Sequence, residues 1–338
     1  MTELAPDTIL SVRDLRTWFR GKRSIAKAVD GVTFELKRGR TLAVVGESGS
    51  GKSVTSLSLM GLLSKPGRIE GGEMLFRDRK GRVHDLAKAK ASTFRALRGS
   101  ELAMIFQEPM TSLNPLYTVG DQIGEMIALH ENVSREEKRR RALEMLKRVE
   151  IPDAENRLDD YPHQMSGGMR QRVMIALALA CGPSLLIADE PTTALDVTIQ
   201  AQILDLLRRL QEEFRMSILF ITHDLGVVAE IAHEVVVMYA GRVVEQAPVE
   251  ELFDRPKHPY TKALLACTPD ARRDLGDAGE RKRLYSISGS VPSITDLPVG
   301  CSFAPRCEMA IEACQTTAPP LVPSGEGRFS RCLREAEL

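Results

Sequence analysis

An eight-residue segment, Gly46-Glu47-Ser48-Gly49-Ser50-Gly51-Lys52-Ser53, constrains this chain more than any other part of its sequence. It follows a short apolar run, residues 41–45, and leads into residues 54–57, which can begin a helix. Glycines let a backbone fold tightly round an anion, so that successive N–H groups point at phosphate oxygens. The helix N-terminus adds partial positive charge. The pattern in this setting predicts a phosphate-binding (Walker A) loop rather than an incidental glycine-rich turn.

Two side chains of this loop have expected roles in binding a nucleotide. Lys52 should reach the β- and γ-phosphates, and Ser53 should offer its hydroxyl to Mg²⁺. Val54 follows directly and belongs to the same expected binding segment, residues 46–54.

Length and composition limit the remaining possibilities. With 338 residues the chain can form one large domain and a smaller one. Its 46 basic and 46 acidic residues balance, which gives no reason to expect nucleic-acid binding. The start lacks the pattern of a signal peptide, and the longest apolar run, Val173 to Cys181, is too short to span a membrane. The six cysteines are therefore expected to be reduced thiols or metal ligands.

Alternating strand and helix patterns predict an α/β fold. Residues 9–19 and 28–36 resemble antiparallel strands joined by a turn at 21–24, and residues 67–82 resemble turns and short edge strands. Apolar runs at 102–106, 185–188 and 218–221, separated by helical patterns, predict a parallel sheet covered on both faces. Ligands of such sheets bind at the carboxyl ends of strands, where Gly46, Gln107, Asp189 and His223 are expected to converge.

Asp189-Glu190, which directly follows an apolar run, forms a second nucleotide motif. Asp189 can hold Mg²⁺ through water, and Glu190 is placed to polarise an attacking water. Carboxylates often end strands, so this pair is informative mainly because the phosphate loop accompanies it.

The segment Ser166-Gly167-Gly168, upstream of Asp189-Glu190 and accompanied by Gln107 and His223, resembles the ATP-binding cassette (ABC) ATPases. The resemblance covers residues 9–260 and implies a RecA-like phosphate-loop core with an antiparallel β subdomain and an inserted helical subdomain at about 108–180. On this basis we expect an ABC nucleotide-binding domain at residues 1–260 and a C-terminal extension at 261–338. It also implies a head-to-tail dimer, in which the phosphate loop of one subunit and the signature Ser166-Gly167-Gly168 of the other enclose ATP.

The resemblance assigns further roles. Glu190 would be the general base and His223 a switch that contacts the γ-phosphate. Gln107 would contact Mg²⁺, together with Ser53 and Asp189, and also the attacking water. Asp196 would communicate across the dimer. Phe19 is the preferred aromatic for stacking on adenine and Trp18 the second choice, because of their offset from the preceding strand.

The signature departs from the commonest family pattern at Met169, where Gln is usual, and methionine cannot make the hydrogen bonds of an amide. The segments 165–173, 191–198 and 257–261 are similar to those of one ATPase subunit of dipeptide/oligopeptide/nickel importers. This similarity implies a second, related ATPase subunit, two membrane-embedded permease subunits and an extracytoplasmic solute-binding protein. The chain would then act peripherally at the cytoplasmic face of the bacterial inner membrane. Peptide, nickel, glutathione and opine importers could share these motifs.

After Tyr260 the composition changes: residues 270–283 are highly charged and residues 286–300 are rich in Ser, Pro and Gly, which suggests a linker to a small tail. Cys301, Cys307, Cys314 and Cys332 are separated by five, six and seventeen residues, without the short Cys-x₂₋₄-Cys spacing that zinc favours. They are either scattered thiols or the four ligands of a [4Fe–4S] cluster. The tail resembles the extension of peptide-importer ATPases, some of which are reported to carry such a cluster. Cys181 and Cys267 are expected to be packing residues.

Two other classes fit less well. Cassette ATPases that act on DNA separate their nucleotide motifs with long insertions, whereas only residues 53–165 separate Lys52 from Ser166. Ribosome-acting members carry two cassettes per chain, and only one is present in this sequence. A regulator without turnover would be expected to lack Glu190 or His223, and both are present.

Overall fold

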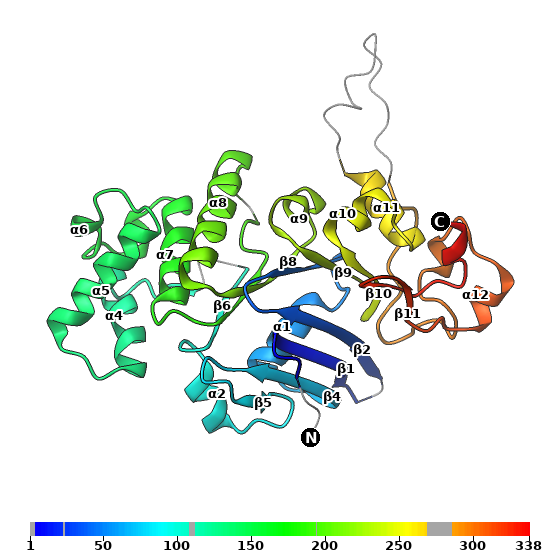
Figure 1. Cartoon of the computed structure of the whole chain (residues 1–338), viewed down its shortest axis with the longest axis horizontal. Helices are drawn as coiled ribbons and strands as arrows, with labels where there is room; N and C mark the ends of the chain where they lie inside the picture. The colour runs from blue at the N-terminus through cyan, green and yellow to red at the C-terminus, as the bar shows by residue number, and fades with distance from the viewer. Residues whose placement is uncertain (1–3, 23, 108–111, 194, 269–285) are drawn as a thin grey trace, which may run out of the picture.

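The chain folds around two stacked β-sheets (Figure 1). A computed structural model describes residues 4–22, 24–107, 112–193, 195–268 and 286–338. Some expected features lie outside these ranges: the charged stretch 270–283, Pro109, Arg23 of the expected turn, and Ala194 before Asp196. The smaller sheet is antiparallel, in the order β2-β1-β4-β5, with the strands β1 (Thr8–Arg20), β2 (Ile25–Lys37), β4 (Gly67–Arg77) and β5 (Val83–Asp85).

The larger sheet has eight strands in the order β11-β12-β10-β9-β3-β8-β7-β6. Its centre is parallel, as the sequence predicts: the pairs β9–β3, β3–β8, β8–β7 and β7–β6 all run in the same direction. The parallel strands are β3 (Thr41–Val45), β6 (Leu102–Ile105), β7 (Leu185–Asp189), β8 (Ser217–Thr222) and β9 (Glu234–Tyr239).

Alternate residues of these strands face opposite sides of the large sheet and join different hydrophobic cores. Val44, Ile187 and Leu219 face the smaller sheet, whereas Ala43 and Phe220 face the opposite side. Helix α1 (Lys52–Met60) packs in the first core between the sheets. Helices α8 (Val197–Phe214) and α9 (Leu225–Ile231) cover the other face of the large sheet (Figure 1). The interiors of these strands are apolar on both sides because both faces of the sheet are buried.

A helical lobe projects beyond the β6 edge of the large sheet (Figure 1). Ser134 caps helix α5 (Arg135–Arg148) by accepting from the N–H of Glu137. The basic residues of this helix form exposed ion pairs such as Arg139–Asp159. Within the described residues, no helix combines the length and apolar character needed to cross a membrane. The lobe comprises α4 (Val119–His130), α5 (Arg135–Arg148), α6 (Ala154–Arg157), the 3₁₀ turn η1 (Pro162–Gln164) and α7 (Gly167–Leu179).

The expectation of turns and short edge strands at 67–82 is correct for the turn at residues 79–80 and wrong for residues 67–77. Residues 67–77 form one long strand, β4, in the interior of the antiparallel sheet, where it pairs with β1. Gly72, with a φ of 94°, lies where the β1–β4 register shifts, so the glycines allow a bulge rather than ending the strand.

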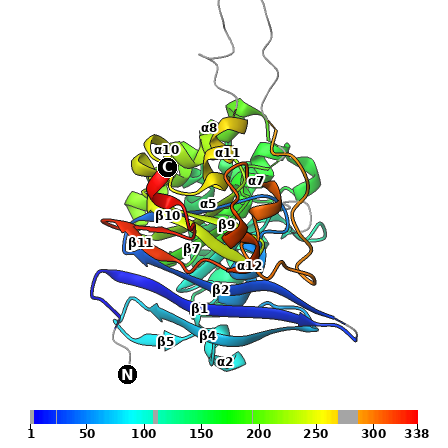
Figure 2. The ribbon, with the colours of Figure 1, turned by 90° about the vertical axis from the view of Figure 1, so that its right-hand side faces the viewer.

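The C-terminal extension is attached to the large sheet rather than hanging from a linker. Its hairpin, β11 (Val322–Gly325) and β12 (Arg328–Ser330), pairs antiparallel with β10 (Arg242–Pro248). Figure 2 shows this hairpin and α12 against the core strands. The remaining elements near the extension are α10 (Val249–Asp254), α11 (Pro259–Cys267), η2 (Ala304–Arg306), α12 (Glu312–Thr316) and η3 (Glu335–Glu337).

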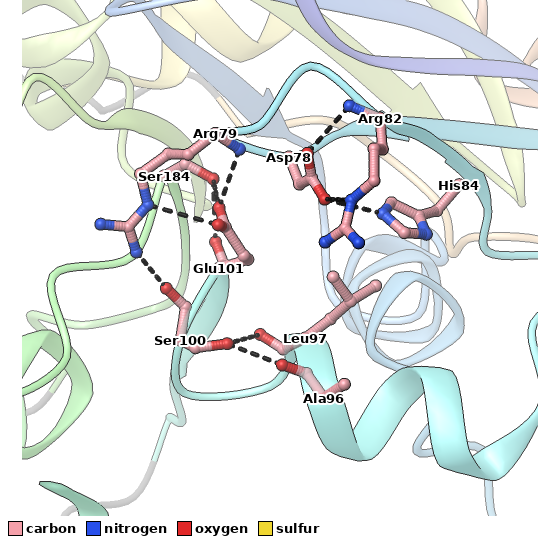
Figure 3. A network of polar contacts seen from close by, with 9 residues as sticks. All are labelled: Asp78, Arg79, Arg82, His84, Ala96, Leu97, Ser100, Glu101 and Ser184. Carbon is pink, nitrogen blue, oxygen red and sulfur yellow. Dashed lines mark hydrogen bonds and ion pairs between the residues drawn. The ribbon is translucent and has the colours of Figure 1, made fainter. Parts of the chain in front are cut away.

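Polar contacts join the antiparallel sheet to the start of β6 and β7 (Figure 3). Glu101 accepts from the Nε of Arg79 at 3.3 Å and from the hydroxyl of Ser184 at 2.7 Å. Asp78, whose side chain is fully buried, accepts from the Nε of Arg82 at 2.8 Å and lies 3.1 Å from the Nε2 of His84. Shortly after the nearby helix α2 (Ala91–Leu97), the hydroxyl of Ser100 donates to the carbonyl of Ala96.

Candidate functional site

The phosphate-loop segment connects β3 to α1 and requires glycine at two close approaches. A Cβ added to Gly46, which has a φ of 152°, would lie 2.2 Å from the carbonyl oxygen of Met238. A Cβ on Gly51, which has a φ of 99°, would lie 2.3 Å from the carbonyl oxygen of Ala28. Around Gly49 nothing lies within 4 Å of such a Cβ. The glycines therefore let the loop pack closely on β2 and β9 while its outer turn stays open.

Lys52 begins α1 and its ammonium group lies over the loop. Its Nζ donates to the carbonyl oxygens of Gly46, at 2.6 Å, and Glu47, at 3.1 Å. The residue is 5% exposed, and burial lowers its pKa against the opposing effect of Glu190, Asp189 and Glu47. The ammonium group is thus held by the loop itself at the N-terminus of α1, where it complements an anion.

Ser53 and Asp189 bring hard oxygen ligands together beside the loop. The Ser53 hydroxyl donates to one carboxylate oxygen of Asp189 at 3.2 Å, and Ser56 donates to the other at 3.1 Å. Burial raises the pKa of Asp189, and the two serine hydrogen bonds oppose this shift. A hydroxyl and a carboxylate at this separation suit Mg²⁺, which takes oxygen ligands and retains several waters.

The Glu190 carboxylate collects three polar partners from three segments. It accepts from the Nε2 of Gln107 at 3.2 Å and from the hydroxyl of Thr193 at 2.9 Å, and the Nδ1 of His223 lies 3.4 Å away. Glu190 has a φ of 48°, and its N–H donates to the carbonyl of Ile221 at 2.9 Å. This conformation turns its side chain off the end of β7 toward the neighbouring strand ends.

The structure thus brings Gln107, Glu190 and His223 together at the carboxyl edge of the sheet, with Lys52 and Asp189 nearby. Sequence reasoning missed two hydroxyls, those of Ser56 and Thr193, which orient the paired carboxylates. Ser56 lies one helical turn after Lys52, so helical periodicity could have indicated it.

The other loop residues differ in exposure. Ser48 and Gly49 are exposed, Ser50 is buried, and Val54 packs partly into the core between the sheets. Of the two candidate adenine-stacking aromatics, Phe19 lies against Gly67. The Lys27 ammonium lies over the ring of Trp18, 5.0 Å from the ring centre.

The signature segment lies in the helical lobe, apart from the phosphate loop. Ser166 caps α7 by accepting from the N–H of Met169, and both Ser166 and Gly167 are exposed. Met169 instead packs against the core of the lobe, and Gly168 lies close to Ile199. Asp196 is also exposed and caps α8. Figure 1 shows α7 beyond β6, whereas α1 lies beneath the centre of the sheet.

The four tail cysteines converge on one pocket. Cys301, Cys307, Cys314 and Cys332 line it together with Phe303. Burial raises the pKa of Cys301 and Cys307, and it raises the pKa of Cys332 to about 11. All six cysteines are free thiols, and Cys181 and Cys267 lie elsewhere and are partly buried. Among the described side chains, no group of three or more His, Cys, Asp or Glu is arranged to hold a single metal ion.

A phosphate loop after β3, an acidic pair at the end of β7 and a histidine after β8 define a phosphate-loop nucleotide hydrolase. The family description "ABC transporter" matches residues 29–193, and "Oligopeptide/dipeptide transporter, C-terminal region" matches residues 244–314.

Relatives match along almost the entire chain. A putative peptide import ATP-binding protein of Brucella ovis is 55% identical over 98% of both chains. The dipeptide transport ATP-binding protein DppD of Escherichia coli is 49% identical over 96% of both. The structure resembles the ATP-binding cassette MJ0796, solved as a dimer with ADP and Pi, with a TM-score of 0.62 and 27% identity, over 71% of this chain and 99% of that one. The chain therefore belongs to the ABC transporter family, as an ATPase subunit with the oligopeptide/dipeptide-type C-terminal region.

Proposed function

We propose that this chain binds and hydrolyses ATP to power the import of peptides across the bacterial cytoplasmic membrane. The observation that carries this proposal is that one chain contains both the nucleotide motifs at the carboxyl edge of the large sheet and the oligopeptide/dipeptide C-terminal region. Relatives similar along almost the whole chain are named as peptide or dipeptide import subunits, which supports the same cargo class.

In the proposed reaction, Lys52 and the N–H groups of residues 46–54 hold the β- and γ-phosphates. Ser53, Asp189 and Gln107 would hold Mg²⁺, which neutralises phosphate charge when bound. Glu190 takes a proton from water as the water oxygen bonds to the γ-phosphorus and the bond to the bridging oxygen of ADP breaks. His223, whose side chain is 61% exposed, contacts the γ-phosphate and reports its presence.

The active site is proposed to be shared between two chains. Ser166, Gly167 and Gly168 would complete the phosphate loop of a second, homologous ATPase subunit, and Asp196 would lie at the same interface. The exposure of Ser166, Gly167 and Asp196 and the position of α7 apart from α1 support this arrangement. Phe19 would stack on adenine, with Trp18 as the second choice.

The proposed assembly pairs two ATPase subunits beneath two permease subunits, and a solute-binding protein delivers the cargo from outside. The chain would thus be peripheral, at the cytoplasmic face of the inner membrane. Copurification with permease subunits and peptide-stimulated ATP turnover in the assembled complex would support this role. If nickel, glutathione or opines stimulate turnover and peptides do not, the cargo belongs to one of those classes. Turnover stimulated by DNA or ribosomes would refute the transport role.

Glu190→Gln tests the assignment of the general base. The variant should bind MgATP as well as the wild-type chain does, because size and most hydrogen bonds are kept. Its hydrolysis should fall by about a hundredfold or more, since an amide cannot accept the proton of water. Calorimetric binding and phosphate release in the assembled complex measure the two effects. Unchanged turnover would refute the assignment.

We further propose that Cys301, Cys307, Cys314 and Cys332 hold a [4Fe–4S] cluster with a structural role. Their convergence on one pocket supports this proposal. In a [4Fe–4S] cluster each thiolate binds a different iron, so the four sulfur atoms lie farther apart than the ligands of a single metal ion. The lack of a single-ion site among the described residues therefore does not contradict the cluster. Binding of the cluster would require the four thiols to lose their protons, because the ligands are thiolates. Burial opposes this loss, since it raises the pKa of Cys332.

Anaerobically purified protein should contain about four iron and four acid-labile sulfide atoms per chain. Cys314→Ser should lose both, whereas Cys267→Ser, outside the pocket, should retain them. Absence of iron and sulfide from the wild-type chain would contradict the cluster and leave the cysteines as free packing thiols.

A further inference from the structure

An arginine of the C-terminal extension contacts the phosphate loop directly. The guanidinium group of Arg306 donates to both carboxylate oxygens of Glu47, from Nη1 at 2.7 Å and from Nη2 at 3.0 Å. We infer that Arg306 is a positioning residue for the phosphate-binding loop, acting through Glu47. This inference rests on nucleotide binding by the chain and not on the nature of the cargo.

Arg306 is built into its place rather than lying on the surface. Its side chain is 4% exposed, and its five N–H donors all have acceptors: besides Glu47 they reach the carbonyls of Ser288 and Ile287 and the hydroxyl of Tyr239. The Glu47 hydrogen bond is the main reason why the pKa of Arg306 is raised. A buried, bidentate pair of this kind fixes orientation as well as charge.

Glu47 is in turn held on both of its sides. Its N–H donates to the hydroxyl of Tyr260 at 2.9 Å, and its carbonyl accepts from Lys52. Tyr239, Tyr260 and Phe303 pack their rings together beneath this contact, with centroids 4.6 to 5.3 Å apart. Phe303 and Arg306 thus hold the extension against the second residue of the loop.

The pair also has an electrostatic consequence. Glu47 places a carboxylate in a loop that binds phosphates, close enough to Lys52 to influence the lysine's pKa. Arg306 neutralises this carboxylate. Without Arg306, Glu47 would repel the phosphates and compete for the Lys52 ammonium group, so affinity for nucleotide would fall even if the loop kept its shape.

The test compares MgATP binding to full-length variants by calorimetry, together with their melting temperatures. Arg306→Met should weaken binding by about tenfold, as expected for losing a charge-assisted pair. Adding Glu47→Gln to this variant should restore most of the affinity, because the uncompensated carboxylate is removed. If Arg306 only stabilised the fold, the added Glu47→Gln substitution would not restore the affinity for MgATP.

Arg331→Met is the matched control. Arg331 is a partly buried arginine of the same extension, and its side chain donates to the carbonyls of Val243, at 2.7 Å, and Pro319, at 3.1 Å. This variant should lower the melting temperature without changing the affinity for MgATP. Equal weakening by both variants, or unchanged affinity in Arg306→Met, would overturn the inference. Failure of the wild-type chain to bind MgATP would refute the proposed function, and the inference with it.

Discussion

Gly46 shows how a single residue can determine whether the loop forms. Its φ of 152° and the Met238 carbonyl, 2.2 Å from an added Cβ, leave no room for a side chain. We expect Gly46→Ala to displace the loop from β9, abolish MgATP binding and destabilise the fold by about 2 kcal/mol or more. Chemical denaturation and calorimetric binding measure these effects.

Gly39→Ala separates the clash from general backbone strain. Gly39 also has a positive φ, 68°, but nothing lies within 4 Å of an added Cβ. This variant should lose only about 1 kcal/mol of stability and keep its affinity for MgATP. If Gly46→Ala behaves in the same way, close packing of the loop is not required.

The residue scale also shows what a motif cannot reveal. The phosphate-loop pattern predicts the roles of Lys52 and Ser53, because glycine spacing and helix position are local properties. It contains no sign of Arg306, which is 259 residues from Glu47 in sequence. Contacts of this kind depend on how the extension folds back, which no local pattern encodes.

The hairpin of β4 and β5 contains a buried carboxylate whose ionisation supports the fold. Burial would raise the pKa of Asp78, but hydrogen bonds from the His84 side chain and from the Arg82 backbone and side chain lower it to about 2. A depressed pKa stabilises the folded state above the unfolded-state pKa, and this stabilisation is lost as the pH falls from about 4 to 2.

Asp78→Asn should therefore lower the free energy of unfolding at pH 7 by about 2 kcal/mol. The difference from the wild-type chain should shrink as the pH falls through this window. Urea denaturation across pH values measures it. Asp159→Asn, which removes an exposed ion pair with Arg139, should change stability little at any pH. A pH-independent loss in Asp78→Asn would indicate packing rather than charge.

Strands marked by a continuous apolar run were predicted well, whereas the glycine-containing strand β4 was not. The buried strands β3, β7 and β8 lie close to their predicted residues because an apolar run is a local signal. Strand β4 was missed because Gly71 and Gly72 suggest turns, whereas pairing with β1 on one side and β5 on the other outweighs their weak strand propensity.

At the scale of the whole molecule, the phosphate loop and the signature segment belong to different parts of the chain. In the shared site that we propose, the signature segment comes from another chain. We expect ATP turnover per chain to fall on dilution to the monomer, while MgATP binding to the loop persists. Turnover measured beside the oligomeric state by light scattering tests this. Substantial turnover by a verified dilute monomer would contradict the shared site.

The sequence alone determined the α/β class, the phosphate loop, the paired carboxylates and the family resemblance, because each depends on residues close together in the chain. The sequence also predicted that Gln107 and His223 converge at the carboxyl edge of the sheet. Only the tertiary structure decided that both reach Glu190 and that Thr193 joins them there, that the tail hairpin extends the main sheet, and that the four tail cysteines share one pocket. Such meetings arise from sheet order and from the path of the extension, which depend on long-range packing. The loop Gly46–Ser53 combines both, since its own residues form it and Arg306 of the extension holds it.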